Sequence, residues 1–347
     1  MNVSLRSPAD HPRVTQWLRG VAVVVFCLIV IGGFVRLSRA GLSIVEWNPV
    51  VGILPPMSDA AWQVEFAKYQ QSPEFRLVNA SMTMDGYRRI FYIEWAHRLL
   101  ARLAGLAVVV PMVIFMWRGM LSRRRAATCL MLAVLFGLQG LLGWLMVASG
   151  LFETPAVSHY RLTIHLLMAI LLFGLAMWTA MDGDASVPRR RHALASTPGS
   201  RAALAVLAVV VLQIAYGGLV AGLKAGHVSY SWPLMGGSLI PAGLFANGVN
   251  WATLTEHAPV VHWLHRWFAF AVVLTVTALA IGLRRAAAPL ASRRAVAATL
   301  ALLGVQMVLG ITMLWLHLPL TLALLHQAVG LAVFAALVVA NHRVLRA

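Results

Sequence analysis

Four histidines occur inside long apolar segments, where a titratable side chain is costly and is therefore a candidate for function. They are His97 and His165 in the first half of the chain and His265 and His326 in the second half. Two neutral imidazoles that face each other across a helix bundle can bind one metal ion. The simpler alternative for any single histidine is a hydrogen bond to a neighbouring carbonyl group.

The number of histidines in each half distinguishes a zinc site from a heme site. A structural zinc ion needs a closed shell of four ligands, and each half offers only two well-placed histidines. Heme iron takes two axial ligands from the protein, because the macrocycle supplies the other four. The pairs therefore predict two heme sites. Glycines at 137, 140, 143, 304 and 310 would let a flat macrocycle approach closely, although such glycines also serve helix packing.

A carboxylate accompanies only one of the two pairs. Glu94 lies three residues before His97, so the two side chains share a helix face, whereas His262 occupies the same place before His265. A carboxylate at the edge of the lipid can accept protons from a substrate or from water. This asymmetry predicts that the catalytic site is in the first half.

An arginine follows one histidine in each half, Arg98 in the first and Arg266 in the second. Guanidinium groups suit carboxylates, so both arginines are candidates for binding heme propionates. Snorkelling of their side chains to the lipid headgroups is the alternative. A salt bridge from Arg98 or Arg88 to Glu94 is the alternative to a catalytic role for that carboxylate.

Long apolar segments must position these residues. With 60% hydrophobic and 11% charged side chains, the chain has too little polar surface for a soluble globule of 347 residues. A membrane span requires about 20 mainly apolar residues. Eight segments meet this requirement: residues 17–36, 90–117, 126–148, 160–181, 202–223, 260–283, 295–316 and 319–341. The sequence thus predicts an all-α membrane protein with eight transmembrane helices.

The connections between these segments differ in charge. Every second connection is rich in arginine, and so are the two terminal segments, whereas the alternate connections carry few basic residues or, at 37–89, as many acidic as basic ones. Cytoplasmic connections carry the excess of basic residues, so both termini are expected to be cytoplasmic. Because this clustering suits topology and anionic lipids, the net charge of +17 does not indicate a nucleic-acid partner.

The chain contains an internal duplication. The sequence "GGFVRLSRAG" at 32–41 resembles "GGLVAGLKAG" at 217–226, and "EWAHR" at 94–98 resembles "HWLHR" at 262–266. Each copy has four spans, so the copies share their orientation. We expect two tandem, pseudo-symmetric four-helix bundles. The expected parts are residues 1–181 with a long outer loop at 37–89, a cytoplasmic linker at 182–201, and residues 202–347.

Together these sequences resemble one known family, the heme A synthases of aerobic bacteria and mitochondria. The resemblance covers the whole chain and rests on "GGFVRLSRAGLSIVEWNPVVGILPP", "EFAKYQQSPEF" with Asn79 and Met82, "IEWAHRLLARLAG", "LQGLLGWLMVASGL", "HYRLTIHL" and the second pair of histidines. Members of that family have eight helices in two similar halves. They oxidise the C8 methyl group of heme O to a formyl group, which gives heme A for terminal oxidases.

The resemblance implies a role for each candidate residue. His97 and His165 would hold the substrate heme, and Glu94 would take part in its oxidation. His265 and His326 would ligate a resident heme b. The implied reaction is two successive hydroxylations through an alcohol, with water as the oxygen source, followed by loss of water from the geminal diol.

Two features depart from the family pattern. Ala101 stands where glycine is common, and the loop cysteine pair of one branch of the family is absent, which argues against a thiol relay. The two cysteines of the chain, Cys27 and Cys129, lie in apolar segments and are expected to be core thiols.

The expected partners are heme O, heme O synthase, an electron acceptor, membrane lipids and a second copy of the chain. The composition favours the inner membrane of a bacterium over that of a mitochondrion. Two other functions fit part of the pattern. A di-heme electron-transfer cytochrome would need no carboxylate at Glu94. A transporter with parallel repeats would need polar or broken helix centres, which the apolar segments do not offer.

Overall fold

Eight long helices make up most of the computed structural model, which describes residues 11–48, 51–183, 197–246 and 248–346. They are α1 (Pro12–Leu37), α4 (Met84–Trp117), α5 (Arg123–Ala148), α6 (His159–Asp182), α7 (Pro198–Gly222), α9 (Ala258–Arg285), α10 (Leu290–Trp315) and α11 (Leu320–Val344). Each is long and apolar enough to cross a membrane. Over the described ranges no strand forms, and the only β-type pairing is an isolated bridge from Met235 to Ser238. The prediction of an all-α membrane protein with eight spans is confirmed.

Capping side chains fix where several helices begin. Ser122 Oγ accepts a hydrogen bond from the Arg125 amide at the start of α5, and Thr83 Oγ1 accepts one from the Gly86 amide at the start of α4. Such caps satisfy amide groups that have no partner within the helix. Because of the Thr83 cap, α4 begins at Met84 instead of residue 90, where the apolar segment begins.

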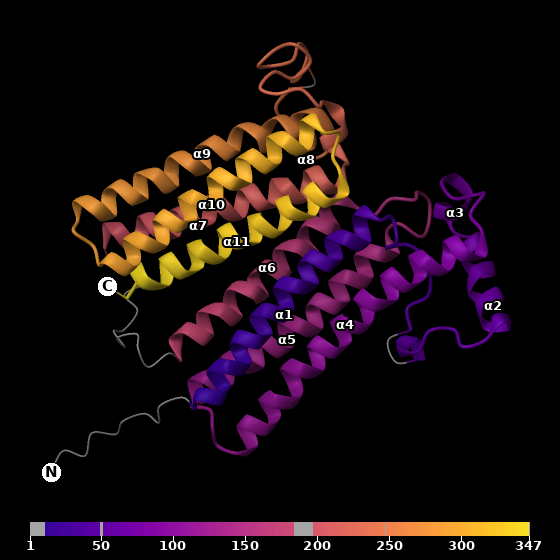
Figure 1. The fold of residues 1–347 in the computed structure, drawn as a ribbon, viewed down its shortest axis with the longest axis horizontal. Helices are drawn as coiled ribbons and strands as arrows, with labels where there is room; N and C mark the ends of the chain where they lie inside the picture. The colour runs from indigo at the N-terminus through magenta and orange to yellow at the C-terminus, as the bar shows by residue number, and fades with distance from the viewer. Residues whose placement is uncertain (1–10, 49–50, 184–196, 247, 347) are drawn as a thin grey trace.

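The long helices form two groups that lie side by side (Figure 1). Helices α1, α4, α5 and α6 contact one another in the first bundle, and α7, α9, α10 and α11 do so in the second. Between the bundles, α6 contacts α7 and α11, and α1 contacts α11. Phe334 and Val338 of α11 belong to the buried core of the first bundle, so the two bundles share an apolar interface. The repeat symmetry and the domain boundaries stay predictions, and most of the expected linker lies outside the described residues.

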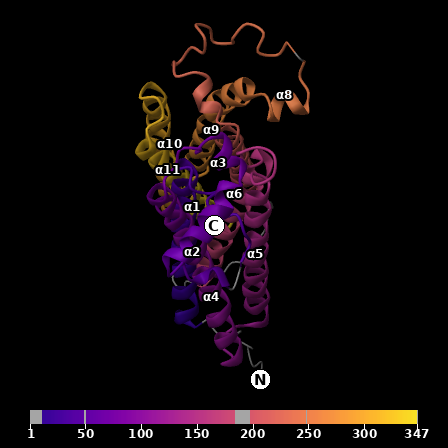
Figure 2. The ribbon, with the colours of Figure 1, turned by 90° about the vertical axis from the view of Figure 1, so that its right-hand side faces the viewer.

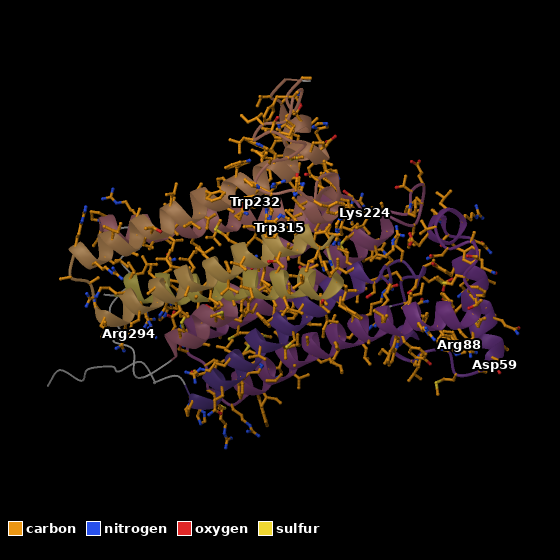
Figure 3. All side chains as sticks on the ribbon, turned by 45° about the horizontal axis from the view of Figure 1, so that its top comes forward. Asp59, Arg88, Lys224, Trp232, Arg294 and Trp315 are labelled. Atoms are coloured by element: carbon orange, nitrogen blue, oxygen red, sulfur yellow. The ribbon has the colours of Figure 1, made fainter. Side chains whose placement is uncertain are left out.

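One end of the molecule carries most of the remaining structure, and we call it the capped end. It contains α2 (Asp59–Gln70), α3 (Pro73–Leu77), α8 (Trp251–Thr255) and the 3₁₀ turns η1 (Val51–Ile53) and η2 (Ala225–Val228). Figure 2 shows that the segment between η2 and α8 extends from the second bundle. The opposite end, which we call the basic end, carries the connections from α4 to α5 and from α9 to α10 (Figure 1), and Arg294 lies there (Figure 3).

Aromatic side chains attach α2 and α3 to the part of α4 that extends beyond the bundle. Trp62, Tyr69, Tyr87 and Phe91 form one buried cluster, in which the rings of Tyr69 and Tyr87 stack with centroids 4.9 Å apart. Pairs of this kind contribute roughly 0.5–1.5 kcal/mol beyond the area that they bury. The long outer loop is therefore a folded cap over the end of the first bundle.

Two further observations bear on the sequence analysis. Arg39 and Lys224, which follow α1 and α7 at equivalent positions of the duplication, have φ angles of 54° and 53°. The chain therefore leaves both helices through a residue in the left-handed conformation.

Cys129 is buried as expected. Cys27 is exposed on the surface of α1, so the expectation of a core thiol is wrong there.

Candidate functional site

The first predicted pair of histidines comes together inside the first bundle. His97 on α4 and His165 on α6 are near enough that a positive charge on one would disfavour a charge on the other. Each ring lies against a glycine of a neighbouring helix. A Cβ atom at Gly32 would lie 2.8 Å from His97 Nε2, and one at Gly143 would lie 2.9 Å from His165 Cε1. These distances are too short for a side chain, so the glycines provide the space for the rings.

The second pair has the same surroundings. His265 on α9 and His326 on α11 are likewise near enough that a charge on one would disfavour a charge on the other. A Cβ atom at Gly217 would lie 3.3 Å from His265 Cε1, and one at Gly310 would lie 3.0 Å from His326 Cε1. These glycines occupy the positions that Gly32 and Gly143 occupy in the first copy of the duplication. Of the five glycines singled out on α5 and α10, only 143 and 310 contact a histidine, and the other three face open space.

Glutamines that the sequence analysis did not single out contact these histidines. Gln139 Nε2 lies 3.4 Å from His165 Nε2 and donates to the His165 carbonyl oxygen at 3.1 Å. Gln306 Nε2 lies 3.2 Å from His326 Nε2. The two glutamines occupy equivalent positions in "LQGLLG" and "VQMVLG", so the duplication contained a signal for them.

A third glutamine has no such signal. Gln213 Nε2 lies 3.2 Å from His265 Nδ1 and donates to the His265 carbonyl oxygen at 3.0 Å. Its counterpart in the first copy is Leu28, so the repeat alone could not have revealed it.

The donor atoms at these sites fit a heme better than a bare metal ion. A closed zinc shell requires four ligands, and among the described residues no group of three or more His, Cys, Asp or Glu side chains is placed to hold a metal ion. Buried nitrogen atoms without a hydrogen-bond partner occur at His165 Nδ1 and His326 Nδ1, and at Nε and Nη1 of Arg266. An imidazole pair next to an unsatisfied guanidinium suits an iron macrocycle with acidic side groups.

Glu94 is buried, and both of its oxygens have partners. Oε2 accepts hydrogen bonds from Ser43 N at 2.8 Å, Ser43 Oγ at 2.7 Å and Ile44 N at 2.9 Å. Oε1 accepts from Arg98 Nε at 3.0 Å and Nη2 at 2.5 Å. The predicted alternative, a salt bridge to Arg98, is therefore present. Glu94 also attaches the start of the outer loop to α4, in a fixed orientation one helical turn from His97.

The other candidate partner of Glu94 is engaged elsewhere. Arg88 Nη2 donates to Asp59 Oδ1 at 2.8 Å, and Figure 3 shows the two side chains together at the capped end.

The two predicted propionate ligands both bind loops at the capped end. Arg98 Nη2 donates to the Ile44 carbonyl oxygen at 3.0 Å. Arg266 Nη2 donates to the Ser231 carbonyl oxygen at 2.8 Å, and its guanidinium lies 4.9 Å from the centre of the Trp232 ring. Loop carbonyl groups thus engage both guanidinium groups. Only Arg266 keeps buried donors without a partner, so it is the better placed of the two for an acidic group.

A cavity of about 350 Å³ lies at the capped end of the first bundle. Aromatic side chains, Trp47, Trp144 and Phe152, form much of its wall, and Lys68 and Arg98 are among its polar groups. Arg98, which lines the cavity, donates to Glu94, so the cavity lies next to the Glu94–Arg98 pair. A substrate could approach the first site from this side.

Comparison with known proteins identifies the family. The model of the COX15-CtaA family, described as cytochrome oxidase assembly protein, matches residues 15–338. The chain belongs to the COX15-CtaA family. A relative from Caulobacter sp. (strain K31) is 46% identical over 286 residues, which cover 82% of this chain and 81% of the relative. Relatives from Sphingopyxis alaskensis and Parvibaculum lavamentivorans are 42% identical, the first over 82% of this chain and 81% of the relative, the second over 83% of each.

These three COX15-CtaA relatives are each named heme A synthase. The resemblance noted from the sequence is thereby confirmed. The roles of the individual site residues stay predictions, although the structure brings each predicted pair together.

Proposed function

We propose that this protein is a heme A synthase, an oxidoreductase that converts the C8 methyl group of heme O to a formyl group. The observation that carries the proposal is that the chain belongs to the COX15-CtaA family and is 42–46% identical to relatives named heme A synthase. The site supports it, because a buried carboxylate, Glu94, accompanies only the first pair of histidines. The chemistry belongs in the first bundle for this reason.

In this proposal the two bundles bind different hemes. His97 and His165 hold the substrate heme O, and His265 and His326 hold a resident heme b. A bound heme b supplies an iron that exchanges single electrons. The unpartnered Nε and Nη1 of Arg266 bind its acidic side groups. Arg98 holds Glu94 and the Ile44 carbonyl in place above the substrate.

The reaction requires a proton acceptor. Conversion of a methyl group and water to an alcohol releases two electrons and two protons, and a second such step gives a geminal diol, which loses water to form the formyl group. Glu94 is placed to receive these protons, because it lies one turn from His97 toward the capped end. Ser43 and Arg98 orient the carboxylate for this role. The four electrons released in the two steps pass to an external electron acceptor.

The setting of the reaction follows from the charge distribution. We place both termini in the cytoplasm, because the arginine-rich connections gather at the basic end. The capped end and both heme sites then face the outer side of a bacterial inner membrane. Residues 1–181 and 202–347 form the two halves of the repeat, and heme O synthase is the natural supplier of the substrate.

Pigment extraction tests the proposal. Wild-type protein from cells that make heme O should contain heme b together with heme O or heme A. The Glu94→Gln variant should retain both hemes but form heme A roughly 10²–10⁴-fold more slowly, the usual contribution of a general base. Glu46→Gln, which changes an exposed carboxylate at the same cavity, is the matched control.

The alternative function, electron transfer by a di-heme cytochrome, predicts a different result of the pigment extraction. The two pairs of histidines have matching surroundings, as in a di-heme electron-transfer cytochrome. Such a protein would contain two heme b molecules per chain, and Glu94→Gln would leave its pigments unchanged. Unchanged heme A formation in this variant would remove the catalytic assignment of Glu94.

A further inference from the structure

A second cavity, of about 260 Å³, lies in the first bundle on the basic-end side of the histidine pair. Trp17 and Gly20 of α1 and Ala104 and Ala107 of α4 line its sides, and Phe136 of α5 lines its inner wall. The only polar atom on these side chains is the indole nitrogen of Trp17, which donates to the Ala107 carbonyl oxygen at 2.7 Å. The cavity is therefore suited to an apolar occupant.

The position of this cavity relates it to the first heme site. Ala104 and Ala107 follow His97 by seven and ten residues on the same helix. At ~1.5 Å per residue, they lie roughly 10–15 Å below it along the helix. Ala104 is buried, whereas Ala107 and Gly20 are exposed on the surface that faces lipid. The cavity thus runs from the inside of the bundle to the lipid, between α1 and α4.

The second copy of the duplication has larger side chains at three of the lining positions and smaller ones at two others, where Trp17 and Phe136 correspond to Ala202 and Leu303. Gly20, Ala104 and Ala107 correspond to Ala205, Val272 and Thr275. Val272 packs with Val206, Val276 and Leu303 in one continuous buried core. Along the helix that carries the histidine, the small residues of the first bundle are therefore matched by larger ones in the second, and Val272 belongs to a closed core there.

We propose that this cavity receives the isoprenoid chain of heme O. Heme O carries a hydroxyethylfarnesyl chain where heme b has a vinyl group, and burial of such a chain is favourable. The inference rests on the proposed function, which assigns heme O to the first bundle and heme b to the second. A volume of about 260 Å³ holds on the order of nine groups of ~30 Å³ each, the volume of one water in the liquid. The cavity takes the first part of the chain, and the remainder extends between α1 and α4 into lipid.

The test fills the cavity with the side chains of the second copy. In the variant Gly20→Ala/Ala104→Val/Ala107→Thr, the affinity of the first site for heme O should fall at least tenfold. The affinity of that site for heme b, which has no isoprenoid chain, should not change. Both are measured by spectral titration of purified protein whose second site already holds heme b. Val110→Ile, which adds a methylene group to a lipid-facing position of α4, is the matched control.

Two results would overturn the inference: unchanged affinity for heme O, or an equal loss of affinity for both hemes. Retention of heme b in the second bundle reports that the variant is folded. The single change Ala107→Val acts only at the exposed rim and should lower heme O affinity in the same direction. A wild-type protein that binds heme O but forms no heme A in cells that supply the electron acceptor would contradict the proposed function but not the place of the isoprenoid chain.

Discussion

Two buried carboxylates of the first half, Glu94 and Glu74, have different surroundings. The carboxylate of Glu94 accepts hydrogen bonds from two residues of the outer loop and from Arg98. Glu74, in the first turn of α3, is 4% exposed. Burial raises the pKa of the Glu74 carboxyl, and the positive charges of Arg39 and Lys224 oppose this effect in part. Glu74 therefore destabilises the cap when it is ionised.

This difference predicts how the stability of the cap depends on pH. A carboxyl whose pKa is higher in the folded state than in the unfolded state binds more protons when folded, so stability rises as the pH falls through that folded pKa. We expect α2 and α3 to be more protected at pH 5 than at pH 7.5. Hydrogen-exchange protection factors, corrected for the intrinsic exchange rate, measure this.

The variant Glu74→Gln serves as the comparison for that measurement. It should raise protection of α3 at pH 7.5 and reduce the pH dependence. Equal pH dependence in the variant and the wild type would show that another group is responsible.

At the level of single residues, the sequence predicted the chemical groups better than their partners. The intramembrane histidines and the unique Glu94 were recognisable because ionisable side chains are rare in apolar segments. The contact of Glu94 with Ser43 joins residues 51 positions apart, and no local pattern encodes it. The contact of Gln213 with His265 was missed for the same reason.

At the level of helices, close approach of a glycine to each histidine is the feature that shapes the sites. An added Cβ atom at Gly143 or Gly310 would press on His165 or His326. Overpacking of this kind costs typically ~1–3 kcal/mol, and ~1.4 kcal/mol corresponds to a tenfold change in affinity. We expect Gly143→Ala to lower heme O and heme A content about tenfold while heme b remains. Gly310→Ala should lower heme b content instead, and extraction of the pigments distinguishes the two results.

Neighbouring glycines on the same helices provide the controls. A Cβ atom at Gly140 or Gly304 would have no atom within 4 Å. Alanine there should leave both hemes in place, and it favours the helix by roughly 0.5–1 kcal/mol. Equal loss of pigment from Gly140→Ala and Gly143→Ala would mean that helix geometry, and not contact with the histidine, governs binding.

The helices themselves were largely predictable, but the cap was not. Each predicted span coincides with one of the eight long helices and extends at most one residue beyond it, because about 20 apolar residues are a strong signal, whereas several helices begin up to six residues before the span. Helices α2 and α3 have mixed polarity, and the sequence indicated only that this region was ordered. Their position is set by Tyr69, Tyr87 and other aromatic residues that meet only in the folded protein.

At the level of the whole molecule, paired glycines on α1 and α7 join the two bundles. Gly32 contacts His97, and the next residue, Gly33, lies against Gln327 of the other bundle. Gln327 Nε2 also donates to the Ile29 carbonyl oxygen at 2.6 Å. On α7, Gly217 and Gly218 contact His265 and Thr163 in the same manner. Each pair of glycines thus touches a histidine of its own bundle and a helix of the other, at equivalent positions of the duplication.

The orientation of the whole molecule determines which side of the membrane the two sites face, and labelling can test it. Met57 is 80% exposed at the capped end, and Arg294 is at the opposite end (Figure 3). Cys27 and Cys129 are first replaced by serine. In intact cells, a membrane-impermeant maleimide should then label Met57→Cys but not Arg294→Cys, because basic residues are retained in the cytoplasm. Permeabilised cells, in which both variants should react, are the control. Labelling of Arg294→Cys alone in intact cells would place both pairs of histidines near the cytoplasm, and substrate entry, proton release and electron transfer would then occur on that side.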